Sequence, residues 1–378
     1  MILSALAGWE TEHKIERMQA RIRTIRKAMA TQQVQALLLT NLPDVRYLTG
    51  FTGSNAALAI TPRKAVLFTD GRYTVQAREE VESARVVIAK KKSAQTMAAA
   101  WLEQQQLTRC GIDGTHTTIA LLEHLRKAVS GRLRRSFFQP LESPLVAAQR
   151  EIKDAAEIRR MRQAAALGAS LFDHILGFLE PGITEVAVAA ELEHQARLLG
   201  AEAMSFETIV ASGGRSALPH GRASSSRIPR KGFITLDFGV ILNGYCSDMT
   251  RTVHMGRATA DEERAYAAVL EAQESAVAAA KHGVTCGDVD EAARSVLKRA
   301  GLAQYFTHST GHGVGLEIHE GPRIAANQKQ PLTEGMVVTI EPGVYLPGRF
   351  GIRIEDTVAI NRNGCEIITP SPKAWIEL

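Results

Sequence analysis

The sequence predicts two successive domains: an α/β domain, then an α+β domain in which long helices alternate with glycine-rich β segments. The chain of 378 residues is long enough for two hydrophobic cores. Before residue 139, short apolar runs alternate with segments of helical period, whereas the later part has long helices separated by β-rich stretches. Residues 139–150 (QPLESPLVAAQR) carry two prolines and no periodicity, so we expect the domains to span residues 1–145 and 146–378.

The first domain begins with an amphipathic helix between residues 14 and 33. Its apolar residues recur every three or four positions and predict a core-facing stripe: Ile15, Met18, Ile22, Ile25 and Met29. Short apolar runs predict strands at 34–40, 56–61, 65–69 and 84–89. Helical periodicity predicts two further helices at 93–106 and 118–129.

The second domain begins with an amphipathic helix of about 25 residues, which starts at Lys153 and closes at Pro181-Gly182. Further helices are predicted at about 184–200, 259–281 and 288–300. The β-rich stretches between and after these helices hold most of the unusual polar residues, so we expect the functional site to be built there.

The composition excludes several classes of protein. With 45% hydrophobic and 22% charged residues, the chain is neither disordered nor membrane-like. The net charge is +5, but the charges are scattered and lack interleaved aromatic residues, which argues against a nucleic-acid site. The four cysteines form no CxxC pair, so no zinc knuckle or redox pair is indicated. The apolar start meets Glu10 and Glu12 too early for a signal peptide, and we expect a cytoplasmic protein that contacts no membrane.

Two aspartates stand out in residues 233–253, FITLDFGVILNGYCSDMTRTV. Asp237 and Asp248 interrupt strand-like apolar segments on either side of an Asn243-Gly244 hairpin signal. The hairpin can make the two carboxylates cross-strand neighbours, and buried like charges at that distance call for a cation. The alternative is that one aspartate caps an element and the other belongs to a turn.

Residues 308–322, HSTGHGVGLEIHEGP, form a second unusual segment with three histidines, His308, His312 and His319. Glycines at 311, 313 and 315 make a poor helix and a poor regular strand, but they allow the chain to approach a ligand closely. A lone histidine would most often be structural, whereas a cluster of three favours a functional role.

Two glutamates, Glu341 and Glu355, complete the pattern because each interrupts or ends an apolar β run, where an unpaired ionised carboxylate is costly. Together with Asp237, Asp248 and His312 they give four carboxylates and one imidazole. This donor set suits two divalent cations, Mn²⁺ first and Co²⁺ or Zn²⁺ as alternatives. Two such ions can lower the pKa of a shared water towards neutrality, so the sequence predicts metal-assisted hydrolysis.

These segments resemble the pita-bread metallopeptidases, the group of methionine aminopeptidase, aminopeptidase P and prolidase. The five predicted ligands match the family motifs residue by residue, in the order DxG, second aspartate, HxxGHxxG, EPG and RxED: Asp237, Asp248, His312, Glu341 and Glu355. Residues 41–54 (NLPDVRYLTGFTGS) and 67–73 (LFTDGRY) resemble the creatinase-type amino-terminal domain. The resemblance covers nearly the whole chain and implies a creatinase-like α/β domain before an α+β pita-bread catalytic domain.

Further residues match the proline-specific branch of this group: His220 in ALPHG, His308, His319 and Arg353. The resemblance implies that Glu341 shuttles a proton and that His319 and His220 donate hydrogen bonds to the reacting carbonyl. It also implies that His308 and Arg353 shape the pocket that accepts proline. The alternatives are a structural imidazole at His308 and a plain ion pair of Arg353 with Asp237 or Asp356.

The resemblance implies a metal-dependent Xaa-Pro aminopeptidase, which removes the first residue from peptides with proline in second position. The first alternative is an Xaa-Pro dipeptidase (prolidase), and a remote one is a non-catalytic pita-bread binding or scaffold protein. By analogy with the family we expect a homodimer, with a tetramer as the alternative. Arg72 and Tyr73 of the DGRY motif would reach a neighbouring subunit's active site or lie in surface packing.

Overall fold

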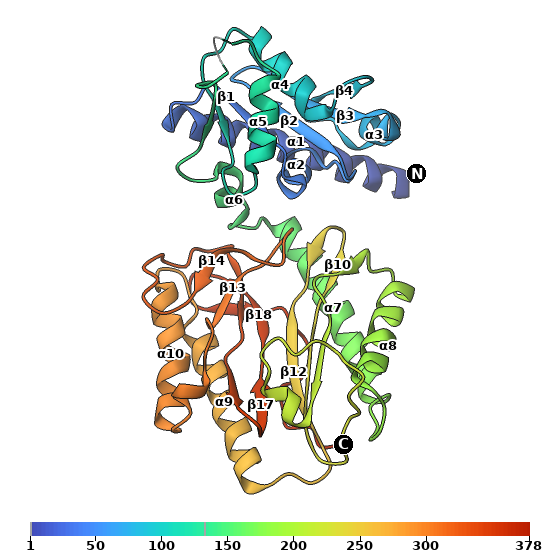
Figure 1. Cartoon of the computed structure of the whole chain (residues 1–378), viewed down its shortest axis with the longest axis vertical. Helices are drawn as coiled ribbons and strands as arrows, with labels where there is room; N and C mark the ends of the chain where they lie inside the picture. The colour runs from blue at the N-terminus through green and yellow to red at the C-terminus, as the bar shows by residue number, and fades with distance from the viewer. Residues whose placement is uncertain (1, 132–133) are drawn as a thin grey trace. The chain divides into compact units, whose positions relative to one another are not determined.

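The computed structural model describes residues 2–131 and 134–378, with side chains from residue 15 onwards. The chain divides into two compact units, Met1–Arg150 and Glu151–Leu378 (Figure 1). The division follows helix α6 (Leu145–Arg150), all of which except Leu145 the proposed limits of 1–145 and 146–378 assign to the second domain.

The first unit is a mixed β-sheet with helices packed against it. Its helices are α1 (Ile2–Thr31), α2 (Leu42–Thr49), α3 (Gln76–Glu80), α4 (Ala94–Gln104), α5 (Ile119–Lys127) and α6. Its strands are β1 (Ala36–Leu39), β2 (Ala56–Ile60), β3 (Ala65–Asp70), β4 (Arg85–Ala89), β5 (Cys110–Ile112) and β6 (Phe138–Pro140). They form one sheet in the order β4-β3-β2-β1-β5-β6, in which β2 runs antiparallel to both of its neighbours and the other pairs are parallel.

The predicted elements of the first unit are present, with shifted ends. Helix α1 begins well before residue 14, and four of its five stripe residues are buried, from Met18 to Met29. Helices α4 and α5 begin after the N-caps Ser93 and Thr118, whose hydroxyls accept hydrogen bonds from backbone N–H groups. The short elements α2, α3, α6, β5 and β6 were not predicted, because three to eight residues are too few to show a period.

The second unit combines four long helices with short antiparallel sheets. The helices are α7 (Ala155–Leu176), α8 (Glu185–Leu198), α9 (Ala260–Ala279) and α10 (Cys286–Arg299). The strands up to residue 255 are β7 (Ala203–Met204), β8 (Ile209–Ser212), β9 (Gly232–Phe238), β10 (Val240–Leu242), β11 (Tyr245–Cys246) and β12 (Met249–Met255). The later strands are β13 (Gly311–Gly313), β14 (Glu320–Ile324), β15 (Val337–Ile340), β16 (Gly343–Leu346), β17 (Phe350–Arg353), β18 (Asp356–Ile360) and β19 (Cys365–Ile367).

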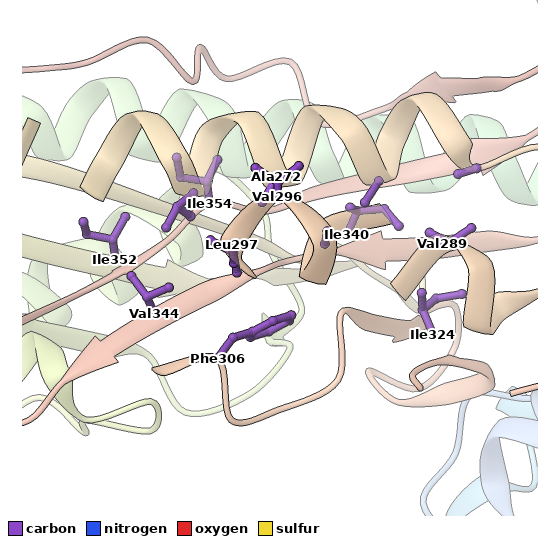
Figure 2. Packing of buried hydrophobic residues seen from close by; sticks show 14 of the residues in the cluster. Ala272, Val289, Val296, Leu297, Phe306, Ile324, Ile340, Val344, Ile352 and Ile354 are labelled. Atoms are coloured by element: carbon purple, nitrogen blue, oxygen red, sulfur yellow. The ribbon is translucent and has the colours of Figure 1, made fainter. Parts of the chain in front are cut away.

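Two large hydrophobic cores lie in the second unit. Helices α7 and α8 pack against the sheet β12-β9-β8, whereas α9 and α10 pack against the strands on the other side of the unit (Figure 1). The second core joins α10, through Val289, Val296 and Leu297, to Ile340, Val344 and Ile352 of the β strands (Figure 2). The apolar faces of both helix pairs are thereby covered, and the polar residues of the strands lie between the two layers of helices. Among the described residues, no helix is long and apolar enough to cross a membrane.

Candidate active site

A cavity of about 630 Å³ opens in the second unit, and its lining includes every residue that the sequence analysis selected as a metal ligand or catalytic residue. These residues come from segments far apart in the chain: His220, Asp237, Asp248, His308, His312, His319, Glu341, Arg353 and Glu355. The strands β9, β13 and β17 and the turns that follow β15 and β17 bring them together.

The two aspartates are held by the predicted hairpin region. Asn243 and Gly244 adopt positive φ angles of 52° and 81° and join β10 to β11, as the primed turn requires. Strands β9 and β12 pair so that Asp237 lies opposite Thr250, and Asp248 immediately precedes β12. The two carboxylates are therefore diagonal neighbours on one face of the ladder, and the residue directly opposite Asp237 is a threonine.

Part of the histidine segment forms the short strand β13, which was not predicted, and this strand is irregular, with a shift of register between His312 and Gly313. Two of its glycines approach the backbone of neighbouring strands. A Cβ atom at Gly311 would lie 1.9 Å from the carbonyl oxygen of Thr339, and one at Gly313 would lie 1.9 Å from that of Gly321. Glycine is needed here because the sheet packs backbone against backbone.

The ring of His312 is oriented to offer a lone pair. Its Nδ1 lies 3.0 Å from the carbonyl oxygen of Gly313, an acceptor, so Nδ1 carries the proton. Its Nε2 lies 3.6 Å from Asp248 Oδ2 and 3.5 Å from Glu341 Oε1. Burial lowers the pKa of His312 to about 4, so the ring is neutral at pH 7 and its lone pair faces carboxylate oxygens.

The carboxylates around this ring are only partly compensated by positive charge. Burial raises the pKa of Glu341 to about 8. Burial and the neighbouring charges of Glu355 and Asp237 raise the pKa of Asp248 well above its usual range. Burial and the charges of Glu341 and Asp237 do the same to the pKa of Glu355. In each case the environment disfavours the ionised form, and the charge of Arg353 offsets this only in part.

These residues fit a divalent metal centre. One donor atom each from Asp248, His312 and Glu355 lies within 4.8 Å of the others, close enough to share an ion. Carboxylate oxygen with one imidazole nitrogen is a donor set that divalent ions such as Mn²⁺, Co²⁺ or Zn²⁺ accept. The backbone hydrogen bond that sets the tautomer of His312 is the usual partner of a metal-binding histidine.

Arg353 is part of a buried network in this cavity, and its carboxylate partner is Asp237, not Asp356. Its guanidinium also donates to Thr250 Oγ1 at 3.1 Å and to the hydroxyl of Tyr345 at 2.6 Å. A further bond to the carbonyl of Pro219, at 3.0 Å, uses another of its N–H groups. These bonds engage the guanidinium from several sides, so Arg353 orients Asp237 and Tyr345 instead of standing ready for a substrate group.

Both ring nitrogens of His308 have partners. Its Nδ1 lies 2.8 Å from the carbonyl oxygen of Ser309, and its Nε2 lies 2.9 Å from the hydroxyl of Tyr345. Burial, aided by the charge of Arg353, lowers the pKa of His308 to about 4. A neutral ring with a protonated Nδ1 therefore accepts a hydrogen bond from Tyr345, which favours a role in shaping the wall of the cavity.

His319 and His220 are exposed to the cavity. The ring centroid of His319 lies 4.4 Å from that of His312 in an edge-on arrangement, and burial lowers its pKa. Neither ring has a hydrogen-bond partner among the residues that the structure describes, so both can contact a bound molecule. Besides Nε2 of His312, which faces the carboxylates, their nitrogens are the imidazole nitrogens that remain available among the described cavity residues.

The sequence analysis did not select four other residues that act here. Thr250 donates to Glu355 Oε2 at 2.8 Å, and Thr339 contacts both His312 and Glu341. Tyr345 joins Arg353 to His308, and Arg323 lies opposite His312 in the β13–β14 ladder. A signal was present for Tyr345, four residues after Glu341, but the threonines look like ordinary strand residues and Arg323 like an ordinary surface charge.

Two family models match the chain. The model of metallopeptidase family M24 matches residues 159–362, and that of the creatinase/prolidase N-terminal domain matches residues 21–152. The first covers the segment that builds the cavity, and the second covers most of the first unit.

Similar proteins span nearly the whole chain. An Xaa-Pro dipeptidase of Pyrococcus horikoshii is 34% identical over 95% of this chain and 99% of its own length. The structure of an Xaa-Pro dipeptidase from Bacillus anthracis superposes with a TM-score of 0.91 at 38% identity, covering 96% of this chain and all of the other. That of an X-Pro aminopeptidase from Thermotoga maritima gives a TM-score of 0.84 at 36% identity, covering 92% of this chain and 98% of the other.

Proposed function

Because the chain belongs to metallopeptidase family M24, with a creatinase-type amino-terminal domain and a pita-bread catalytic domain, we propose that it is an Xaa-Pro dipeptidase. The family membership makes it a metal-dependent peptidase of the prolidase type. The proposal concerns the length of the substrate, and it reverses the order of preference that the sequence alone suggested. Relatives with the dipeptidase name support this order.

One observation carries the proposal: an arginine without an ionic partner faces the cavity beside the carboxylate cluster. Arg323 lies opposite His312 in an antiparallel ladder, so both side chains leave the same face of the sheet. Arg222 pairs with Glu207 at 2.9 Å, and Arg353 with Asp237. Among the described residues, Arg323 has no such partner and is the cation of this cavity that remains available to substrate.

A dipeptide substrate offers a carboxylate that this arginine could bind. Its carboxylate lies on the residue directly after the scissile bond, whereas a longer peptide has a neutral amide at that position. A guanidinium binds a carboxylate through two parallel N–H bonds and gives a neutral amide much less. Arg323 would therefore favour a substrate that ends one residue beyond the bond that is cut.

We assign the metal centre to Asp237, Asp248, His312, Glu341 and Glu355, with two divalent ions, Mn²⁺ first. When bound, such a pair would polarise the scissile carbonyl and lower the pKa of water. Three of these carboxylates contact His312 or Arg353. The side chain of Glu341 is 18% exposed, against 12% for Asp237 and 6% for Asp248. We therefore assign proton transfer to Glu341, because it is the carboxylate best placed to reach substrate.

The imidazoles divide into two groups by their available nitrogens. His319 and His220 stand at the cavity surface and would donate hydrogen bonds to the oxygen that gains charge during the reaction. His308 and Arg353, held by Tyr345, would form the wall against which the proline ring packs. Proline fixes φ and lacks an N–H group, so a shaped wall replaces the hydrogen bonds that other residues offer.

The aminopeptidase remains the second candidate, supported by the similarity to the X-Pro aminopeptidase of Thermotoga maritima. A scaffold role is disfavoured because all five residues assigned as metal ligands are present and line the cavity. We keep manganese, a homodimer and a cytoplasmic location as predictions from the sequence.

The test compares three substrates that share the same amino-terminal residue, alanine: Ala-Pro, Ala-Pro amide and Ala-Pro-Ala. Protein treated with EDTA is expected to recover activity with Mn²⁺ or Co²⁺ and to cleave Ala-Pro with the highest kcat/KM. The variant Arg323→Met is expected to raise KM for Ala-Pro by on the order of tenfold to a hundredfold, the value of a charged hydrogen bond, and to affect the amide much less.

The matched control is Arg222→Met, which removes a cavity arginine that already has a carboxylate partner. It should change KM for Ala-Pro by less than about threefold. Faster cleavage of Ala-Pro-Ala than of Ala-Pro by the wild-type protein would overturn the dipeptidase proposal in favour of the aminopeptidase.

A further inference from the structure

A buried ion pair on α10 contacts the segment that carries His308 although neither member lines the cavity. The side chain of Asp290 is 1% exposed and that of Arg294 is 28% exposed. Arg294 Nε donates to Asp290 Oδ2 at 2.6 Å, and its Nη2 donates to Oδ1 at 3.2 Å. The two residues are one helical turn apart, so α10 holds the carboxylate and the guanidinium in a single orientation.

This pair binds three residues of the segment 306–310. Arg294 Nη2 donates to the carbonyl oxygen of His308 at 2.6 Å, and Nη1 donates to that of Phe306 at 3.3 Å. Asp290 Oδ1 accepts from the backbone N–H of Thr310 at 3.2 Å and from its hydroxyl at 2.7 Å. The segment forms no regular strand before Gly311, so these side-chain bonds replace a ladder.

Packing holds the first residue of the same segment. The guanidinium of Arg294 lies 4.2 Å from the ring centroid of Phe306, and that ring lies in the core beneath α10 (Figure 2). The ring of Phe306 meets the ring of His308 edge-on at 5.1 Å. The guanidinium of Arg294 thus donates hydrogen bonds from its edge and packs on Phe306 with its face, and both contacts hold the chain that leads to His308.

The contacts continue to the cavity. The ring of His308 binds Tyr345, which Arg353 also binds, and the carbonyl of Thr310 accepts from the backbone N–H of Glu341 at 2.7 Å. A displacement of the segment 306–310 would therefore move one wall of the cavity. A buried ion pair contributes little net stability compared with apolar packing, whereas it imposes direction on its partners.

We propose that Asp290 and Arg294 are positioning residues that fix His308 in the orientation needed for substrate binding and turnover. The proposal rests on the proposed peptidase function but not on the choice between dipeptidase and aminopeptidase. The pair acts through His308 and touches neither substrate nor metal.

The main test variant is Asp290→Asn/Arg294→Met. The new amide oxygen still accepts from Thr310, no unpaired charge is buried, and the two bonds from Arg294 to the carbonyls of His308 and Phe306 are lost. We expect kcat/KM for the preferred Xaa-Pro substrate to fall by on the order of tenfold to a hundredfold, as small misplacements of a site do. The conservative variant Arg294→Lys, which keeps one donor and the charge, should recover part of this loss.

The control variant is Arg299→Met on the same helix. Arg299 pairs with Glu271 at 3.0 Å, and both side chains are more than 60% exposed. This change should leave kcat/KM within about twofold of wild type, because exposed ion pairs contribute little.

A double-mutant cycle separates positioning from general loosening of the fold. In a His308→Ala background, Asp290→Asn/Arg294→Met should lower kcat/KM by less than about threefold, because the residue that it positions is already absent. A loss in that background as large as in the wild type would overturn the proposal.

A second readout needs no activity. Hydrogen exchange of the metal-free protein should become at least about tenfold faster in the peptide 304–312 of the double variant, with no change elsewhere. Unchanged exchange in this peptide would overturn the proposal. If the wild-type protein cleaved no Xaa-Pro substrate, the proposed function would fail, while the exchange result would still decide whether the pair orders the segment.

Discussion

Glu355 and Asp356 are adjacent, both are buried, and their surroundings differ in charge. Asp356 accepts hydrogen bonds from Arg251 Nη2 at 2.8 Å, Lys373 Nζ at 2.7 Å and Gln273 Nε2 at 3.0 Å. Two cations thus surround one carboxylate. This cluster is a complete buried network in which the protein itself supplies the positive charge.

Glu355 faces the cavity, where the four carboxylates assigned to the metal centre have one arginine bonded to them, Arg353, which pairs with Asp237. Consecutive residues of an extended chain point to opposite sides, so one step along the chain separates a balanced cluster from an unbalanced one. The difference teaches that burial alone does not account for the raised pKa of Glu355. The four carboxylates and Arg353 leave an excess of three formal negative charges, which divalent cations would neutralise.

The two clusters are connected through the backbone. Arg251 binds the carbonyl oxygens of both Thr250 and Glu355, and it also binds the carbonyls of Ser371 and Pro372. The balanced cluster therefore holds the backbone of Glu355 from behind, and the carboxyl-terminal segment is part of that support. The following predictions test the comparison, from the largest expected effect to the smallest.

Replacing the cavity carboxylate, Glu355→Gln, should lower kcat/KM by at least about 100-fold, because even changes behind a metal ligand can cost that much. The metal-free variant should be as stable as wild type or more stable, since one of several repelling charges is gone. Kinetics with saturating Mn²⁺, metal analysis and urea unfolding measure these effects. Full activity with full metal content would contradict the assignment of Glu355 as a ligand.

Replacing its neighbour, Asp356→Asn, should lower the stability of the fold and leave metal binding intact, the opposite of what Glu355→Gln should do. The free energy of unfolding is expected to fall by about 3 kcal/mol, because Arg251 and Lys373 would be left without their carboxylate. Bound metal should remain. The control Glu271→Gln breaks an exposed pair with Arg299 and should cost less than about 0.5 kcal/mol. Equal losses in the two variants would show that Asp356 is not a structural charge centre.

The metal-free protein should lose stability as pH rises from about 6.5 to 8. In this window the unfolded chain has already released the proton that the folded state retains on Glu341, because burial raises the pKa of Glu341 to about 8. The pKa values of Asp248 and Glu355 are shifted in the same direction. Below pH 6.5 the lowered pKa values of His308 and His312 oppose this trend, because unfolding then takes up protons.

We expect a fall of about 2 kcal/mol in the free energy of unfolding over that window, measured by urea titration at several pH values. The variant Glu341→Gln should flatten the curve, and saturating Mn²⁺ should abolish the fall. A metal-free protein whose stability rises steadily from pH 6.5 to 8 would contradict the unbalanced charge inferred for the cavity.

The smallest expected effect concerns Thr250, which lies between the two clusters and donates to Glu355 Oε2. Thr250→Val should weaken Mn²⁺ binding by about tenfold, as the loss of a ligand's hydrogen-bond partner does. The matched control is Thr235→Val, because the hydroxyl of Thr235 contacts Thr252 instead of a carboxylate. Calorimetric titration measures the Mn²⁺ affinity of the two variants. Equal affinities would show that the hydrogen bond from Thr250 to Glu355 does not contribute to metal binding.

Much of the fold could be predicted because its signals are local. Helices α7 to α10 extend over at least 14 residues each, long enough to repeat a period, and α4 and α5 begin after hydroxyl caps. Strand β13 was missed because glycines look unfavourable in a strand when the close approach of Thr339 and Gly321 is unknown. Local pattern cannot report how near another segment comes.

The candidate site divides in the same way. Carboxylates and histidines in apolar runs, such as Asp237, Glu341 and Glu355, are unusual by themselves, and the sequence alone was sufficient to select them. Their partners are ordinary residues until the chain folds: Thr250 and Glu355 are 105 positions apart, and Arg251 and Ser371 are 120 apart. The availability of Arg323 and the engaged nitrogens of His308 are likewise contacts, which composition and spacing do not encode.

The sequence by itself therefore determined which side chains are too polar for their surroundings, and with them the metal chemistry and the family. Only the tertiary structure decided which charges are balanced, because a charge is neutralised by neighbours in space and not by neighbours in the chain. Glu355 and Asp356 share a peptide bond and a buried position, but it is the carboxylate of Asp356 that pairs with cations, Arg251 from β12 and Lys373 from the carboxyl-terminal segment.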